Sequence, residues 1–318
     1  MHIARFSNTL LSNVLFSTSR IHLLLVIAAS LVFSGVDSGA DLATQASTQV
    51  FPRSLEFHAE KVKAKHIDDV INKMAPDGWM PAFILDDELR KRVIFRRPLD
   101  PARQVKTLEY QAMTVGGMMK ELEEVVNTQA TDGWLPVFIT RDTFKHRIIF
   151  ARDKTKPTAE TEYMKLIVDE SRHLDDAFNH HGTTGWEPKF VIEYGERFHV
   201  LFRRKKGIEH QPKRYRALKT LATSLIDNTY DELAAEGWQP LLTFQDGERY
   251  RMLFVEHPNA TRLQYFADRV TKIKHLDDSF SRWNEQGWHP IFVFQFSADT
   301  TLLTEEEQFR LLFARVRS

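Results

Sequence analysis

The stretch Gly185-Trp186-Glu187-Pro188 is one copy of a pattern, Gly-Trp-any residue-Pro, that occurs five times in this sequence. The other copies are Gly78-Trp79-Met80-Pro81, Gly133-Trp134-Leu135-Pro136, Gly237-Trp238-Gln239-Pro240 and Gly287-Trp288-His289-Pro290. Five of the 6 tryptophans stand in this motif, and successive ones lie 55, 52, 52 and 50 residues apart. Spacing of this regularity is typical of tandem repeats.

The residues around each motif follow one order. An aromatic residue marks an opening strand, an amphipathic helix of about three turns follows, and the motif leads into two further apolar strands. We therefore predict an α+β fold of five tandem β-α-β-β repeats of about 50 residues, packed into one array. Closure of this array into a ring is left open. The predicted repeats cover residues 54–98, 107–153, 161–206, 213–257 and 262–317.

Each part of the motif has a structural interpretation. Glycine suits the left-handed residue that ends a helix, tryptophan can fold back over the apolar face of that helix, and proline suits the start of a strand. Because all five units share these residues, we assign them to folding rather than to a unique active site. A ligand-binding aromatic stripe is the rival interpretation.

The repeat resembles a small bacterial domain of unknown function with an aromatic opening strand, a short helix, a Gly-Trp-Glu type motif and a final strand that ends in Lys or Arg. Trp186-Glu187 matches that motif most closely, and the other copies replace the glutamate. This resemblance implies a fold and no activity. Five α/β repeats are also similar in number to the penteins, whose enzymes use a catalytic cysteine that this chain lacks, so that comparison bears on ring closure alone.

The N-terminus has the features of a targeting segment. Basic residues precede an apolar run from Ile21 to Phe33, and Ser38-Gly39-Ala40 supplies small residues for cleavage. We predict a signal peptide at residues 1–40, a linker at 41–53 and export to the periplasm or medium. A mitochondrial presequence is the alternative. The apolar run is shorter than the ~20 residues of a membrane span, so no permanent span is expected.

The amino-acid composition argues against several classes of function. The 43 basic residues balance 43 acidic ones, so no net field indicates a nucleic-acid partner. There are 0 cysteines, which excludes disulfides, thiol catalysis and thiolate metal sites. No cofactor is expected.

Candidate chemistry is sparse. The candidate binding residues are His180, His181, Glu187 and His199 in the third repeat. Their spacing matches no known metal motif, so we predict neither a metal site nor catalytic residues. Acidic pairs such as Asp68-Asp69 and Asp175-Asp176 are interpreted as solvated helix starts that complement the helix dipole.

Basic strand ends have three interpretations. Arg96-Arg97 and the run from Arg203 to Lys206 fit a phosphate site, an edge strand protected by charge, or arginine stacked on the motif tryptophan. We favour the edge strand. For the whole chain we predict an exported, non-enzymatic repeat protein that binds a protein or envelope component. The alternative is an enzyme with a site assembled between repeats, around the third.

Overall fold

The computed structural model describes residues 55–87, 89–104, 106–116, 119–142, 145–155, 160–220, 226–247, 249–257, 263–298 and 306–316. The predicted signal peptide and linker lie outside these residues. No helix in the described part of the chain is long and apolar enough to cross a membrane.

Strands and helices follow one another in the same order along the chain. The first elements are β1 (Leu55–Val62), α2 (Ile67–Met74), β2 (Met80–Asp87) and β3 (Arg90–Pro98). Next come β4 (Leu108–Gly116), α3 (Leu122–Thr131), β5 (Leu135–Asp142) and β6 (Lys145–Asp153), then β7 (Thr161–Val168), α4 (Leu174–Gly182), β8 (Glu187–Tyr194) and β9 (Arg197–Lys205). The last are β10 (Tyr215–Thr220), α5 (Ile226–Ala235), β11 (Trp238–Asp246), β12 (Arg249–Glu256), β13 (Leu263–Val270), α6 (Leu276–Glu285), β14 (His289–Ala298) and β15 (Glu306–Val316).

These strands form five separate three-stranded antiparallel sheets, which confirms the α+β prediction and agrees with a repeated organisation. We name the three strands of a sheet in chain order the opening strand, the motif strand and the return strand. The spatial order is β1-β3-β2, β4-β6-β5, β7-β9-β8, β10-β12-β11 and β13-β15-β14. The return strand is therefore always central.

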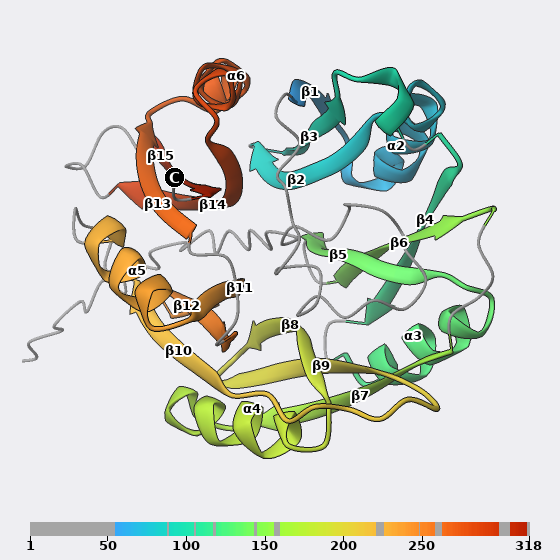
Figure 1. Ribbon diagram of the computed structural model, residues 1–318. Helices are drawn as coiled ribbons and strands as arrows, with labels where there is room; N and C mark the ends of the chain where they lie inside the picture. Colours follow the sequence, from blue (N-terminus) through green and yellow to red (C-terminus); the bar gives the residue numbers. More distant parts are fainter. Residues whose placement is uncertain are drawn as a thin grey trace, which may run out of the picture.

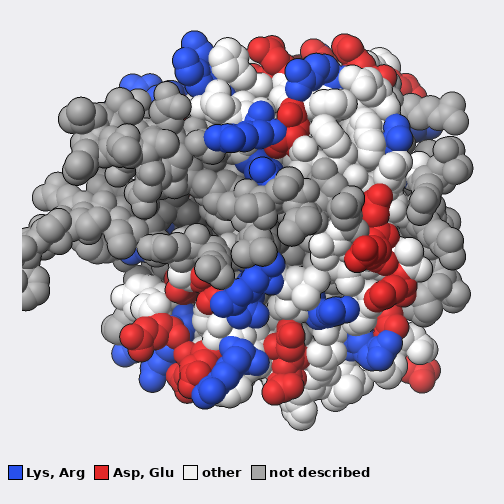
Figure 2. All heavy atoms as spheres, turned by 90° about the vertical axis from the view of Figure 1, so that its left-hand side faces the viewer, with Lys and Arg blue, Asp and Glu red and all other residues white. Residues whose placement is uncertain are grey.

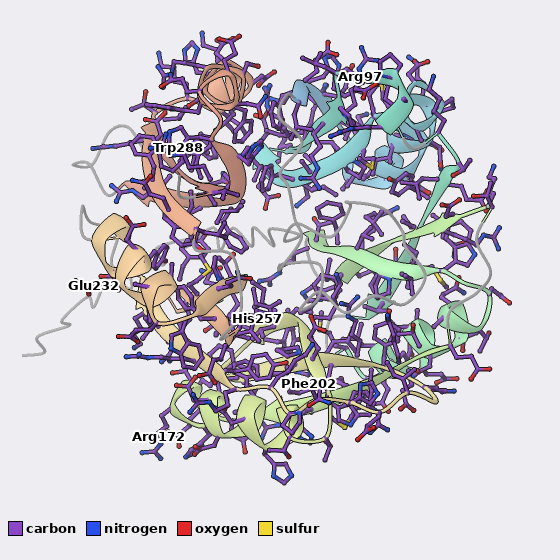
Figure 3. The ribbon with its side chains drawn as sticks, in the orientation of Figure 1. Arg97, Arg172, Phe202, Glu232, His257 and Trp288 are labelled. Carbon is purple, nitrogen blue, oxygen red and sulfur yellow. The ribbon has the colours of Figure 1, made fainter. Side chains whose placement is uncertain are left out.

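Both faces of each return strand are buried, and this explains its continuous apolar run. In β9, for example, Val200 and Phe202 pack with Phe178 of α4, whereas Leu201 packs with Val126 of α3. The helix of one unit thus lies between its own sheet and the sheet of the next unit. Fully buried phenylalanines such as Phe202, labelled in Figure 3, fill these layers.

Each motif glycine lies one to three residues beyond the end of the helical segment and has the predicted left-handed conformation. Gly185 has a φ of 80°, a conformation that costs a residue with a Cβ roughly 1–2 kcal/mol. A Cβ on Gly185 would also lie 2.2 Å from the Cβ of His210. Two residues after the tryptophan, the register of the motif strand shifts at the proline, for example between Pro188 and Phe190. The residue after each motif proline is therefore a β-bulge.

The motif tryptophans are buried or half-buried. Trp79 and Trp288 are each 7% exposed, and the other three motif tryptophans are half-buried. In four units an arginine from the end of the return strand lies over the indole, 4.2–4.4 Å from the ring centroid; these pairs are Arg97–Trp79, Arg152–Trp134, Arg204–Trp186 and Arg315–Trp288. Figure 3 labels Arg97 and Trp288. The edge-strand interpretation is wrong for Arg97 and Arg204, because the return strand that carries each of them is central.

In each of the first three units an asparagine in the helix joins the unit to the next. Asn127 of α3 donates to the carbonyl oxygen of Tyr163 at 2.9 Å and accepts from its N–H at 2.8 Å. Asn72 binds Tyr110 in the same way, and Asn179 binds Tyr215. Each helix thereby covers the exposed edge of the following opening strand, which would otherwise present unpaired backbone groups.

The acidic first turn of the helix has a role that the sequence interpretation missed. Asp175 Oδ1 accepts the Ala217 N–H at 2.8 Å, and Glu123 Oε2 accepts the Lys165 N–H at 2.8 Å. Both acceptors bind the opening strand of the next unit. The description of such acids as simply solvated is therefore wrong for these two residues, although a favourable contribution from the helix dipole is compatible with both roles.

The last helix contacts the first strand. Phe280 of α6 lies 5.3 Å from Phe57 of β1 between ring centroids, and Asn284 Nδ2 donates to the Leu55 carbonyl at 3.0 Å. Gln295 Nε2 of β14 also donates to the Asp86 carbonyl of β2 at 3.1 Å. Figure 1 shows α6 beside β1 at the top of the molecule.

Candidate functional site

The third unit carries a cluster of charged side chains at the start of its motif strand. We call Glu187, Lys189, Arg203 and Lys213 the unit-3 cluster. Glu187 and Lys189 are two positions apart on β8, and Arg203 of β9 is the register partner of Glu187. Lys213 comes from the segment just before β10.

The carboxylate of Glu187 is the centre of this cluster. Its Oε1 lies 3.5 Å from Arg203 Nη2, and its Oε2 lies 3.3 Å from Lys213 Nζ. Glu187 is 8% exposed. Burial acts to raise its pKa, but Arg203, Lys213 and Lys189 together outweigh that effect and hold the pKa at about 2. Glu187 is therefore a carboxylate at any pH near neutral.

The protonation state of Lys189, unlike that of Glu187, is mixed near neutral pH. It is the bulged residue after Pro188 and is partly exposed. Burial, and after it the charge of Arg203, lower the pKa of Lys189 to about 7, although Glu187 acts in the opposite direction. At neutral pH the amine is therefore present in both protonation states.

The other units lack this arrangement. Aliphatic residues occupy the bulge in all four, namely Ala82, Val137, Leu241 and Ile291. The position of Glu187 is held by Met80, Leu135, Gln239 and His289. Sequence reasoning singled out Glu187 but missed Lys189, and the signal was a single charged residue among five that follow the motif proline.

The four histidine and glutamate candidates do not form one site. Glu187 and His199 lie on the same face of the third sheet, but their register partners are Arg203 and Ile192, so they are separated by about four residues of strand, roughly 13 Å. His181 packs on Phe202, which faces α4, with 5.0 Å between ring centroids, and His180 beside it is exposed. Within the described ranges no three His, Asp or Glu side chains are grouped to hold a metal ion.

Two buried histidines form a second unusual feature. His146 of β6 is 2% exposed and His199 of β9 is 4% exposed, and Nδ1 of each has no hydrogen-bond partner among the described residues. Burial, followed by Arg141 and His199, lowers the pKa of His146 to about 4. Burial likewise lowers the pKa of His199. Both rings are therefore neutral at pH 7. His146 had no sequence signal beyond its place at a position where other units carry Lys91 or Phe198.

Comparisons with known proteins give no assignment: no protein-family model, no curated protein and no solved structure matches this chain.

Proposed function

We propose that this chain is an exported, non-enzymatic repeat protein whose five units close into a ring, and that it serves as a binding or scaffold module for a protein or envelope component. The observation that carries the proposal is the contact of α6 with β1. It repeats, between the last and the first unit, the helix-to-opening-strand contact found between α2 and β4, α3 and β7, α4 and β10, and α5 and β13.

Closure has a physical advantage for repeats of this size. A unit of about 50 residues buries too little apolar surface to be robust alone. In a ring every helix is covered by two sheets and every opening strand is covered by a helix, so no unit is terminal. The Phe57–Phe280 contact and the Asn284 hydrogen bond support this arrangement.

The polar residues that recur in the units support a scaffold rather than an enzyme. The helix asparagines, the first-turn acids and the arginines over the tryptophans all make contacts that hold the fold together. Acidic and basic side chains are interspersed on the face shown in Figure 2. An enzyme centred on the third repeat is the alternative, and the separation of Glu187 from His199 along the strand argues against it.

Two experiments test this function. N-terminal sequencing of the protein from fractionated cells should show a start near residue 41 in the exported fraction. An intact Met1 on cytoplasmic protein refutes export.

Partner binding is tested by photo-crosslinking in living cells. The crosslinking amino acid replaces one exposed helix or helix-flanking residue per variant, at Thr128, Arg172, Glu232 or Arg282. We expect one discrete protein adduct, which forms when the crosslinking residue is in either of two neighbouring units and does not form when it is in the other units. No adduct from any position, or the same adducts from all four, contradicts a specific binding module.

A further inference from the structure

The fold does not require a charged residue at the position of Lys189. The other units place Ala82, Val137, Leu241 and Ile291 at this bulge, so an aliphatic side chain satisfies the packing. A lysine there loses hydration that an aliphatic residue would not need. Its ammonium makes no ion pair with a described residue, and its closest recorded contact is the Phe190 ring, 5.6 Å from Nζ to the centroid.

The neighbouring charges leave Lys189 without a counter-ion of its own. The two oxygens of Glu187 contact Arg203 and Lys213 respectively. Three cationic side chains from three segments thus surround one carboxylate. Tyr163 of β7, the register partner of Arg203, is buried and its pKa is raised by burial, so it stays neutral.

We propose that the unit-3 cluster binds a small oxyanion, a carboxylate or phosphate-type group of a ligand, through Lys189 and Arg203. Lysine and arginine are the side chains that bind such groups by charge-assisted hydrogen bonds. Partial exposure of Lys189 and Arg203 gives the anion access, while Glu187 holds Arg203 and Lys213 in place. This site goes beyond the proposed scaffold function, since it concerns a small ligand.

Anion binding at this site has a distinctive signature. The anion adds a negative charge beside an amine whose pKa in the free protein is about 7. Binding therefore raises that pKa and draws a proton from solution. At pH 7.5, above a pKa of about 7, the neutral amine is the larger fraction in the free protein, so we expect a measurable proton uptake of less than one proton per anion.

Isothermal titration calorimetry on the whole protein tests the proposal. Sulfate represents a phosphate-type dianion and acetate represents a carboxylate, and neither probe titrates near pH 7.5. Runs in two buffers with different ionisation enthalpies give the number of protons taken up. We expect one ion per chain with proton uptake, and the tighter of the two probes identifies the ligand group. Absence of binding by both probes up to 10 mM, on the order of the weakest affinity such a site would have, overturns the proposal.

The repeat supplies substitutions that are compatible with the fold. Lys189→Leu introduces the residue that the fourth unit carries at Leu241, and Arg203→Val introduces that unit's Val255. We expect Lys189→Leu to weaken binding at least tenfold and to abolish proton uptake. Lys65→Leu, at an exposed site in the first unit, is the matched control and should leave both unchanged. Equal binding by the Lys189→Leu protein and wild type refutes the site.

A measurement on the wild type covers the case in which these variants do not fold. Brief acetylation at pH 7, mapped by mass spectrometry, compares the reactivity of Lys189 with that of other lysines. A neutral amine reacts fastest, so Lys189 should be labelled early, and saturating sulfate should slow its labelling at least fivefold. Labelling of Lys189 that sulfate does not change contradicts the proposal.

Discussion

Removal of the helix asparagines tests whether the last unit is joined to the first. Asn127→Ala deletes two hydrogen bonds to the backbone of Tyr163 and leaves one N–H and one C=O unpaired at a covered strand edge. Each unsatisfied buried polar group costs about 1–3 kcal/mol, so the loss from two should be about 2–6 kcal/mol. Asn284→Ala deletes one such bond, to the Leu55 carbonyl, at a side chain that is 3% exposed. Its expected cost is about 1–3 kcal/mol.

Urea unfolding, followed by tryptophan fluorescence and far-ultraviolet circular dichroism, measures both changes. Asn127→Asp is a useful control because Asp231, at the equivalent place in the fourth unit, accepts the Tyr265 N–H and cannot donate. This variant should lose about half as much stability as Asn127→Ala. If the array were open, α6 would be a terminal helix and Asn284→Ala would change the free energy of unfolding by less than about 0.5 kcal/mol, as surface substitutions do. That result, beside a large effect of Asn127→Ala, refutes closure.

Three further predictions follow from single residues. His146 has a pKa of about 4 in the folded protein and near 6.5 in the unfolded chain, so its contribution to the free energy of unfolding is full above pH 6.5. That contribution declines by about 3 kcal/mol as the pH falls to 4. His146→Tyr removes this titration and should therefore flatten the acid side of the stability–pH curve. Trp288→Ala should lower the free energy of unfolding by about 3–5 kcal/mol in denaturant titrations, and a change below 1 kcal/mol contradicts its role as an anchor. Gly185→Ala should cost at least roughly 1–2 kcal/mol by thermal unfolding, because of its positive φ and the close approach of His210, whereas an unchanged melting temperature opposes this assignment.

The sequence predicts local elements well here because each is repeated. A single apolar stretch such as Val200 to Phe202 is ambiguous, but five copies at equal spacing identify a strand. The order of strands within a sheet was not predictable, because antiparallel pairing leaves either partner of a hairpin at the edge. This ambiguity led to the wrong edge-strand interpretation of Arg97.

Contacts between units were the least predictable part. The helix asparagine is present in the first, second, third and fifth units and is replaced by Asp231 in the fourth, and a lone amide in an amphipathic pattern is normally interpreted as an exposed residue. Its role depends on where the next opening strand lies, which periodicity alone does not give. Lys189 was missed for a similar reason, because its environment is set by the bulge after Pro188 and by Arg203 on another strand.

The fourth unit shows that the arginine over the motif tryptophan does not depend on the ion-pair arrangement of the other units. In three units an opening-strand glutamate pairs with the return-strand arginine, as in Glu162–Arg204, but here the charges are exchanged and Arg214 pairs with Glu256. Arg214 still lies over Trp238, 5.9 Å from the ring centroid. A guanidinium therefore lies over the indole in all five units, although in the fourth it comes from the residue just before the opening strand. A tryptophan that bound a ligand by stacking would need that face free, so we place binding on the positions where the units differ, and Lys189 is the clearest of these.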